Sequence, residues 1–220
     1  MKVCEKPCDG TRRCYLEKRR SDSVLPPDMQ AISIVIPVYN SERTLVELYE
    51  RIVRVAGEQS IEFEMILVND GSRDASWSVI EGLSARDKRV RGFNLMRNYG
   101  QHNALLCGVR AARMPVIVTM DDDLQHPPEE LPILLSALEP DVDVVYGVPE
   151  TQQHGLLRDL ASAITKKALQ ASMGADVARL VSAFRVFRTP LREAFGVYQG
   201  SFISLDVLLT WGTTRFSARR

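Results

Sequence analysis

The residues best suited to chemistry in this chain are three consecutive aspartates that directly follow an apolar run, in the segment VTMDDDLQHPPEE (118–130). If the strand continues into them, alternation directs Asp121 and Asp123 to one side and Asp122 to the other. Two converging carboxylates repel one another unless a cation lies between them. Mg²⁺ and Mn²⁺ prefer oxygen ligands and fill their remaining positions with water and phosphate. Asp121 and Asp123, with Gln125 as a third oxygen ligand, therefore predict a Mg²⁺ or Mn²⁺ site that holds a diphosphate.

A simpler interpretation of this segment is a charged, proline-containing loop that leads into a helix starting near Pro128. A single D-x-D pattern is compatible with either interpretation. His126 flanks the expected helix, and we expect it to be a solvated cap rather than a ligand.

Two further segments favour a ligand site. In NDGSRD (69–74), Asp70 is placed to accept hydrogen bonds from a base or ribose, and Gly71 allows a close approach of the backbone. In RNYGQHNAL (97–105), Arg97 and the glycine before a helix are consistent with contact to an anion, and equally with ordinary capping. The sequence contains neither G-x-G-x-x-G nor a glycine-lysine phosphate loop, which excludes those two nucleotide-binding motifs.

Alternating strand and helix patterns must position these residues. Apolar runs predict strands at 32–37, 63–70, 90–96, 115–121 and 142–147. Helix-period segments separate them: one from Leu45, capped by Asn40 or Ser41 and ended by Gly57, one after Asp74, one over 101–113 and one from Pro128. This order predicts a single α/β domain over 31–220, with a mostly parallel sheet flanked by helices. The strand ends at 37–40, 69–74 and 121–127 should then meet at one edge of the sheet, where such folds bind ligands.

Composition limits the partners and the compartment. Of 220 residues, 45% are hydrophobic, and 28 basic residues balance 28 acidic ones, so no overall charge draws the chain to nucleic acid. No apolar run is long enough for a transmembrane helix or a signal peptide, which makes the cytoplasm the default compartment. Residues 1–30 are polar and proline-containing, and we expect them to form a flexible leader. Its three cysteines are not spaced as a paired zinc site would be.

Four segments, ISIVIPVYNSERTL, MILVNDGSRD, NLMRNYGQHNALLCGV and VTMDDDLQHPPEELP, occur in the order seen in family 2 glycosyltransferases with the Rossmann-like GT-A fold. Over about residues 31–216 the chain most resembles the polyprenyl-phosphate (dolichol-phosphate-type) sugar transferases. The resemblance implies metal-dependent, inverting transfer of a sugar from a UDP- or GDP-sugar to a lipid phosphate. It places Asp121, Asp123 and Gln125 on the metal and the donor diphosphate. The donor-binding set that it implies is Pro37, Tyr39, Asn40, Asp70, Gly71, Arg97 and Asp122.

The segment VSAFRVFRTPLREAF (181–195) resembles the family pattern V-G-D-F-R-L, which assigns Arg185 to the acceptor side and to the catalytic set with Asp121 and Asp123. The chain departs from the family at three places. Ser41 stands where a glutamate is common, Ala183 replaces the acid before F-R, and the sequence stops at TTRFSARR without the membrane spans that often follow, as expected of a truncated domain.

Residues 155–174 pair apolar and basic positions at helical spacing. They could lie as an amphipathic helix on the cytoplasmic face of a membrane, or pack on the core. Two alternative functions stay open: transfer to a soluble or polysaccharide acceptor, and a catalytically weak partner protein that binds a nucleotide sugar.

Overall fold

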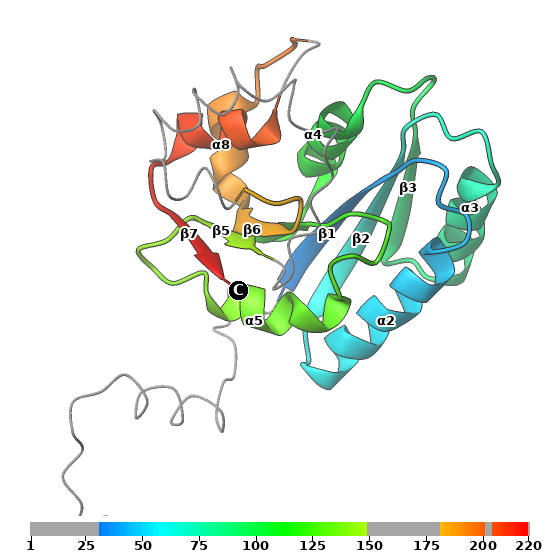
Figure 1. Ribbon diagram of the computed structural model, residues 1–220, viewed down its shortest axis with the longest axis horizontal. Helices are drawn as coiled ribbons and strands as arrows, with labels where there is room; N and C mark the ends of the chain where they lie inside the picture. Colours follow the sequence, from blue (N-terminus) through cyan, green and yellow to red (C-terminus); the bar gives the residue numbers. More distant parts are fainter. Residues whose placement is uncertain (1–30, 149–180, 201–203, 220) are drawn as a thin grey trace, which may run out of the picture.

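The computed structural model describes residues 31–148, 181–200 and 204–219, and centres on a seven-stranded sheet of order β3-β2-β1-β4-β6-β5-β7 (Figure 1). The strands are β1 (Ala31–Val38), β2 (Glu62–Asn69), β3 (Val90–Asn94), β4 (Val116–Thr119), β5 (Val144–Gly147), β6 (Arg185–Arg188) and β7 (Phe216–Arg219). The first four are parallel, β6 runs antiparallel to both β4 and β5, and β7 is parallel to β5. The predicted mostly parallel α/β sheet is confirmed, and the insertion of β6 between β4 and β5 was not predicted.

Helices cover both faces of this sheet (Figure 1). They are α2 (Leu45–Glu58), α3 (Ser76–Arg86), α4 (Gln101–Ala111), η2 (Pro128–Glu130), α5 (Leu131–Ser136), η3 (Thr189–Phe195) and α8 (Leu205–Gly212). Ile34 and Ile36 of β1 pack in the core with α2, α3 and α5, whereas Val35 packs in the core with α4, η3 and α8. Because both faces of the central strands are buried, these strands are apolar throughout rather than alternating.

The ends of α2 differ from the prediction. The helix begins at Leu45 after Thr44, runs through Gly57 and ends at Glu58. Asn40 does not cap it, because Asn40 has a left-handed backbone (φ 56°) and its side-chain oxygen accepts the N–H of Arg73 at 2.8 Å. Asn40, one of the two residues predicted as the cap, joins two strand-end turns instead, and the side chain of Ser41, the other, does not cap α2 either.

Helix α4 lies unusually close to the sheet at Gly108. A Cβ atom at this position would lie 2.3 Å from Val35 Cγ1 and 3.2 Å from Val68 Cγ2, well inside van der Waals contact. The absence of a side chain at Gly108 therefore allows the close approach of α4 to β1 and β2.

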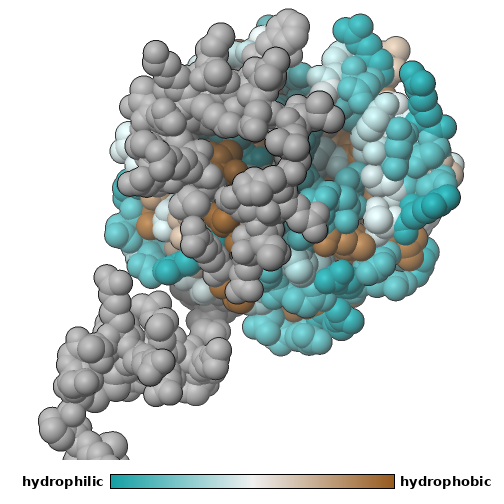
Figure 2. Space-filling model, viewed as in Figure 1, coloured by the Kyte–Doolittle hydropathy of each residue, from teal (hydrophilic) through white to brown (hydrophobic). Residues whose placement is uncertain are grey.

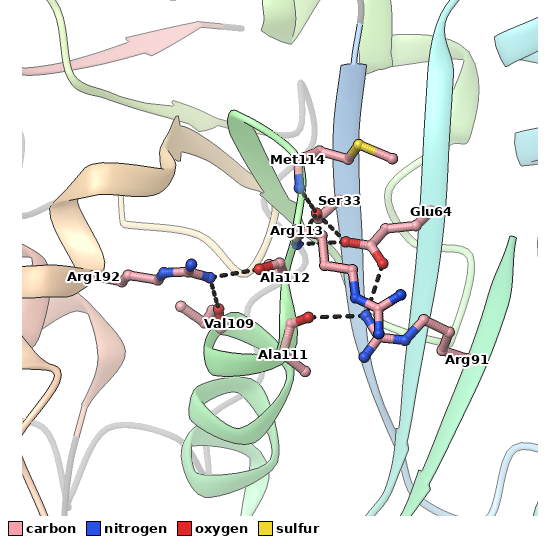
Figure 3. A network of polar contacts seen from close by, with 9 residues as sticks. All are labelled: Ser33, Glu64, Arg91, Val109, Ala111, Ala112, Arg113, Met114 and Arg192. Carbon is pink, nitrogen blue, oxygen red and sulfur yellow. Dashed lines mark hydrogen bonds and ion pairs between the residues drawn. The ribbon is translucent and has the colours of Figure 1, made fainter.

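A buried carboxylate connects the C-terminal end of α4 to strands β1, β2 and β3 (Figure 3). Glu64 of β2 is 5% exposed and accepts hydrogen bonds from the Ser33 hydroxyl at 2.7 Å and the Arg113 N–H at 2.6 Å. Its other oxygen pairs with Arg91 at 2.8 Å, and Arg91 also donates to the Ala111 carbonyl at 2.9 Å. Burial alone would raise the pKa of Glu64, but its hydrogen bonds with Ser33, Arg91 and Arg113 outweigh burial and lower the pKa.

We expect Glu64→Gln to lower the free energy of unfolding at pH 7 by about 1–3 kcal/mol, because the amide oxygen can still accept from Ser33 and Arg113 but Arg91 loses its charged acceptor. A lowered pKa in the folded state means that the ionised carboxylate stabilises the protein above the ordinary value of 4.5. This contribution is lost as the pH falls through the folded-state pKa, so the stability gap between the two proteins should narrow in acid. Urea unfolding at several pH values measures the gap. Glu62→Gln, on an exposed residue of the same strand, is the control; parallel acid sensitivity of wild type and Glu64→Gln would contradict the assignment.

The visible surface of the described residues is mostly hydrophilic, with hydrophobic residues in separate patches (Figure 2). Within the described ranges, no helix combines the length and the apolar character needed to cross a bilayer. The predicted leader at 1–30 and the predicted amphipathic segment at 155–174 lie outside the described residues.

Candidate donor and metal site

The three polar strand-end segments meet at one edge of the sheet, as predicted. The Tyr39 N–H, just after β1, donates to Asp122 Oδ2 at 3.1 Å. The next residue, Asn40, donates its N–H to Ser72 Oγ at 3.0 Å. The end of β1 is therefore bonded on one side to the acidic loop, which we define as residues 121–127, and on the other side to the turn after β2.

The acidic loop does not continue the strand. Strand β4 ends at Thr119, and the loop forms bends in which Leu124 has a positive φ of 61°. The predicted alternation of Asp121, Asp122 and Asp123 therefore does not apply. Asp121 instead accepts a hydrogen bond from the side chain of Gln101 at 2.6 Å, while Asp123 Oδ1 accepts the N–H of Gln125 at 3.0 Å.

Asp122 acts as an anchor for the loop. Its Oδ2 accepts the Ser41 hydroxyl at 2.5 Å in addition to the Tyr39 N–H. Burial raises the pKa of Asp122, the Ser41 and Tyr39 hydrogen bonds oppose that rise, and the charge of Asp123 adds to it. Ser41, the residue that departs from the family pattern, thus supplies the hydroxyl that holds the loop. Glu42 faces elsewhere, and its carboxylate accepts the Ala75 N–H at the start of α3.

Asp121, Asp123 and Gln125 carry the oxygen donors that a hard divalent cation prefers. Asp123 and Gln125 are exposed and Asp121 is half-buried. Across the parts of the chain that the structure describes, no group of three or more acidic, histidine or cysteine side chains could enclose a metal ion. A site with two carboxylates leaves coordination positions for water and a diphosphate, which is the usual arrangement for Mg²⁺ and suits Mn²⁺.

Asp70 and Gly71 shape the neighbouring loop. Asp70 is 3% exposed, and its carboxylate accepts the N–H groups of Tyr99 at 2.7 Å and Gly100 at 2.9 Å. The prediction that Asp70 contacts a base does not fit this geometry, because its oxygens bind the protein's own backbone. A Cβ on Gly71 (φ +69°) would lie 2.6 Å from the backbone nitrogen of Asn98. The close backbone approach predicted at Gly71 is therefore made by the loop that contains Asn98.

Two exposed aromatic side chains and a cation lie on the segments that surround the acidic loop. Tyr39 and Tyr99 are each 46% exposed, and the guanidinium of exposed Arg97 lies 4.8 Å from the centre of the Tyr99 ring. Such surfaces suit a planar base and a phosphate. Pro37 is buried near the end of β1 and lies in register with Val68 of β2, so it is part of the sheet beneath the candidate site.

Arg185 occupies a different setting from the one predicted. Its side chain is 2% exposed and forms an ion pair with the buried Asp206 of α8. Tyr146 of β5 donates its hydroxyl to the same carboxylate at 3.0 Å. A direct contact between Arg185 and an acceptor phosphate does not fit this burial. The side chain instead ties α8 to the sheet, although its Nε atom has no hydrogen-bond partner among the residues that the structure describes.

Three contacts of the site were not anticipated. The first is the side-chain bond from Gln101 to Asp121. The second involves His126, which is not a solvated cap. Its ring stacks on that of Phe184 with the ring centres 5.4 Å apart, and its Nε2 lies 3.3 Å from Ser182 Oγ. Burial lowers the pKa of His126. The third is the carbonyl of Ala183, which accepts the Thr119 hydroxyl at 2.7 Å. No local pattern signalled these contacts, because the bonded residues are 20 to 64 positions apart in the sequence.

A mostly parallel sheet covered on both faces, with an acidic loop and two turns at the carboxyl ends of its strands, places a site where such sheets bind ligands, and the fold is of the GT-A type. Residues 33–195 match the model of the family described as Glycosyl transferase family 2. The match covers most of the sequence, and the chain belongs to this family.

Curated relatives agree with this assignment. The chain is 40% identical over 164 residues to an undecaprenyl-phosphate 4-deoxy-4-formamido-L-arabinose transferase of Shewanella sediminis, covering 74% of this chain and 50% of the relative. A protein of the same name from Pseudomonas fluorescens is 39% identical over 170 residues, or 77% of this chain and 50% of the relative. The chain thus spans about half the length of these relatives.

Among solved structures, glucosyl-3-phosphoglycerate synthase of Mycobacterium tuberculosis, in complex with Mn²⁺, UDP and glucosyl-3-phosphoglycerate, has a TM-score of 0.62 at 20% identity. The match covers 86% of this chain and 68% of that one. The mannosyltransferase PcManGT of Pyrobaculum calidifontis, in complex with GDP-Man and Mn²⁺, has a TM-score of 0.58 at 19% identity and covers 86% and 54% of the two chains. At these identities the likeness concerns the fold.

Proposed function

We propose that this chain forms the catalytic domain of a metal-dependent, inverting glycosyltransferase that moves a sugar from a UDP- or GDP-sugar to a polyprenyl phosphate. The observation that carries the proposal is the acidic loop, held at the carboxyl edge of the sheet by Gln101 on one side and by Tyr39 and Ser41 on the other. The names of the relatives at about 40% identity support undecaprenyl phosphate as the acceptor class.

The chemistry follows from the charges that the reaction creates. When the donor is a nucleotide sugar, the departing nucleoside diphosphate gains negative charge. A Mg²⁺ or Mn²⁺ ion held by Asp121, Asp123 and Gln125 would stabilise this charge. Tyr39 and Tyr99 offer aromatic faces to the base, and the exposed Arg97 offers a positive charge to the phosphates.

The acceptor side needs no general base. A lipid phosphate is already ionised near neutral pH, so its oxygen can attack the anomeric carbon in line without losing a proton. This agrees with Ala183 at the position where an acid is expected from the family pattern. A lipid acceptor also places the reaction at a membrane surface, which we infer to be the cytoplasmic face.

Ala183 also favours a second candidate, a protein that binds a nucleotide sugar with little turnover and acts with a partner. The two candidates differ in one result: the first transfers sugar to a lipid phosphate without a partner, and the second binds the donor with no transfer or hydrolysis. If a soluble or polysaccharide acceptor is used instead of lipid phosphate, its hydroxyl would need a base that Ala183 does not provide.

Titration calorimetry with UDP and GDP, each with and without Mn²⁺, tests the donor site. We expect one nucleotide to bind only when Mn²⁺ is present, and this binding to be lost in Asp123→Ala because a ligand to the metal is gone. Glu129→Ala is the matched control, since that exposed acid pairs with Arg51 and Arg54 at 2.5 and 2.6 Å, outside the acidic loop. Binding that is equal with and without Mn²⁺, or absent for both nucleotides in the folded protein, would contradict the proposal.

A further inference from the structure

The first turn of α4 connects two parts of the candidate site. Gly100, directly before the helix, donates its N–H to buried Asp70 at 2.9 Å, which fixes the position of the helix start. Gln101 is the first residue of α4, and its side-chain nitrogen lies 2.6 Å from Asp121 Oδ1. The next residue, His102, accepts the N–H of Leu205 at 3.2 Å through Nδ1 and so joins α4 to the start of α8. Gln101 thus projects from a helix end that is held on two sides.

The chemical type of Gln101 matters at this position. An amide donates a hydrogen bond to a carboxylate without adding a charge, whereas lysine or arginine would place a positive charge beside Asp121 and compete with a cation. The acidic loop is irregular, so its own backbone does not dictate the rotation of the Asp121 carboxylate. A donor on a rigid helix supplies that orientation, as partners outside the coordination shell commonly do for metal-binding carboxylates.

We propose that Gln101 is a positioning residue that orients Asp121 for the divalent cation and so sets the affinity of the site for metal. The inference rests on the proposed function, because it takes Asp121 as a ligand of the donor-bound cation. It assigns to α4 a role in metal affinity that neither the family match nor the names of the relatives give to any residue of this helix.

The test measures Mn²⁺ binding to the whole chain by electron paramagnetic resonance, with and without the nucleotide that calorimetry identifies. Gln101→Met keeps an unbranched side chain of similar length and removes the donor. We expect it to weaken Mn²⁺ binding about tenfold, the lower end of what the loss of such a partner costs. The melting temperature without metal should not change, because Gln101 is exposed. Excess Mn²⁺ should restore the turnover of the variant.

Asn103→Leu is the matched control. It removes a side-chain amide from the same turn of α4, but that amide donates to the Tyr99 carbonyl at 2.7 Å rather than to Asp121. We expect this variant to bind Mn²⁺ as the wild type does. Equal Mn²⁺ affinity of wild type and Gln101→Met would overturn the role of Gln101 and leave the proposed function standing, as would an equal loss in both variants. Absence of Mn²⁺ binding in the wild type would overturn both proposals.

Discussion

Asp121→Asn should lower the turnover of sugar transfer by about 10²- to 10³-fold, the range found when one preorganised group that stabilises transition-state charge is removed. The amide that replaces the carboxylate is neutral and binds a hard cation weakly, so the developing charge on the diphosphate loses its stabilisation. Asp122→Asn should have a much smaller effect. The side chain of Asp122 accepts hydrogen bonds from the Tyr39 N–H and the Ser41 hydroxyl, and the carbonyl oxygen of asparagine can accept both.

The two variants can be compared with a radiolabelled UDP- or GDP-sugar and a short-chain polyprenyl phosphate at saturating Mn²⁺. Because the residues are adjacent and the substitutions identical, a general disturbance of the acidic loop would affect both alike. Equal losses would show that the loop works as a unit and that Asp121 has no special role. A larger loss in Asp122→Asn would reverse the assignment of ligand and anchor that the hydrogen bonds indicate.

The second large effect should come from Arg185→Met. The substitution leaves the carboxylate of Asp206 buried beside Tyr146 without its cation, and breaking a buried ion pair in this way costs about 3–5 kcal/mol. The loss can be measured by urea unfolding. The double variant Arg185→Met, Asp206→Leu should recover much of it, because both charges are then removed from the interior.

The double variant also distinguishes a structural role of Arg185 from a role in acceptor binding. If Arg185 ties α8 to the sheet, the double variant should regain transfer activity together with stability. If Arg185 binds the acceptor phosphate directly, as the family resemblance implied, the double variant should be stable and still have a strongly raised KM for the lipid phosphate. Full stability of the single variant would contradict the buried ion pair itself.

Patterns of hydrophobicity sufficed for the parallel half of the sheet, because each of β1, β2 and β4 is buried on both faces and carries an apolar run for that reason. The meeting of three polar strand ends followed from the parallel arrangement alone. The placement of β6 did not follow, since a short strand that pairs antiparallel with β4 and β5 has the same local pattern as a parallel one. Its position is decided by tertiary packing.

In the candidate site too, the sequence predicted some features and not others. The sequence predicts one site for Asp121, Asp122 and Asp123, and this stays a prediction, but their directions were assigned by assuming an extended strand. The bends of the acidic loop cancel that alternation, and the direction of each carboxylate depends on partners distant in the sequence, such as Gln101 and Ser41. Asp70 was assigned to a ligand for the same reason: its backbone partners at Tyr99 and Gly100 are 29 and 30 residues away.

The close contact at Gly108 links the protein core to the candidate site, because Gly108 and Gln101 lie on the same helix, α4. A side chain there requires α4 or Val35 to shift, and a shift of α4 would carry Gln101 with it while Asp122 stays bound to the end of β1. Neighbouring carboxylates of the acidic loop would then be pulled apart by two elements moving relative to each other. We therefore expect a larger residue at position 108 to weaken binding at the proposed donor site, although Gly108 itself packs against β1 and β2 in the core.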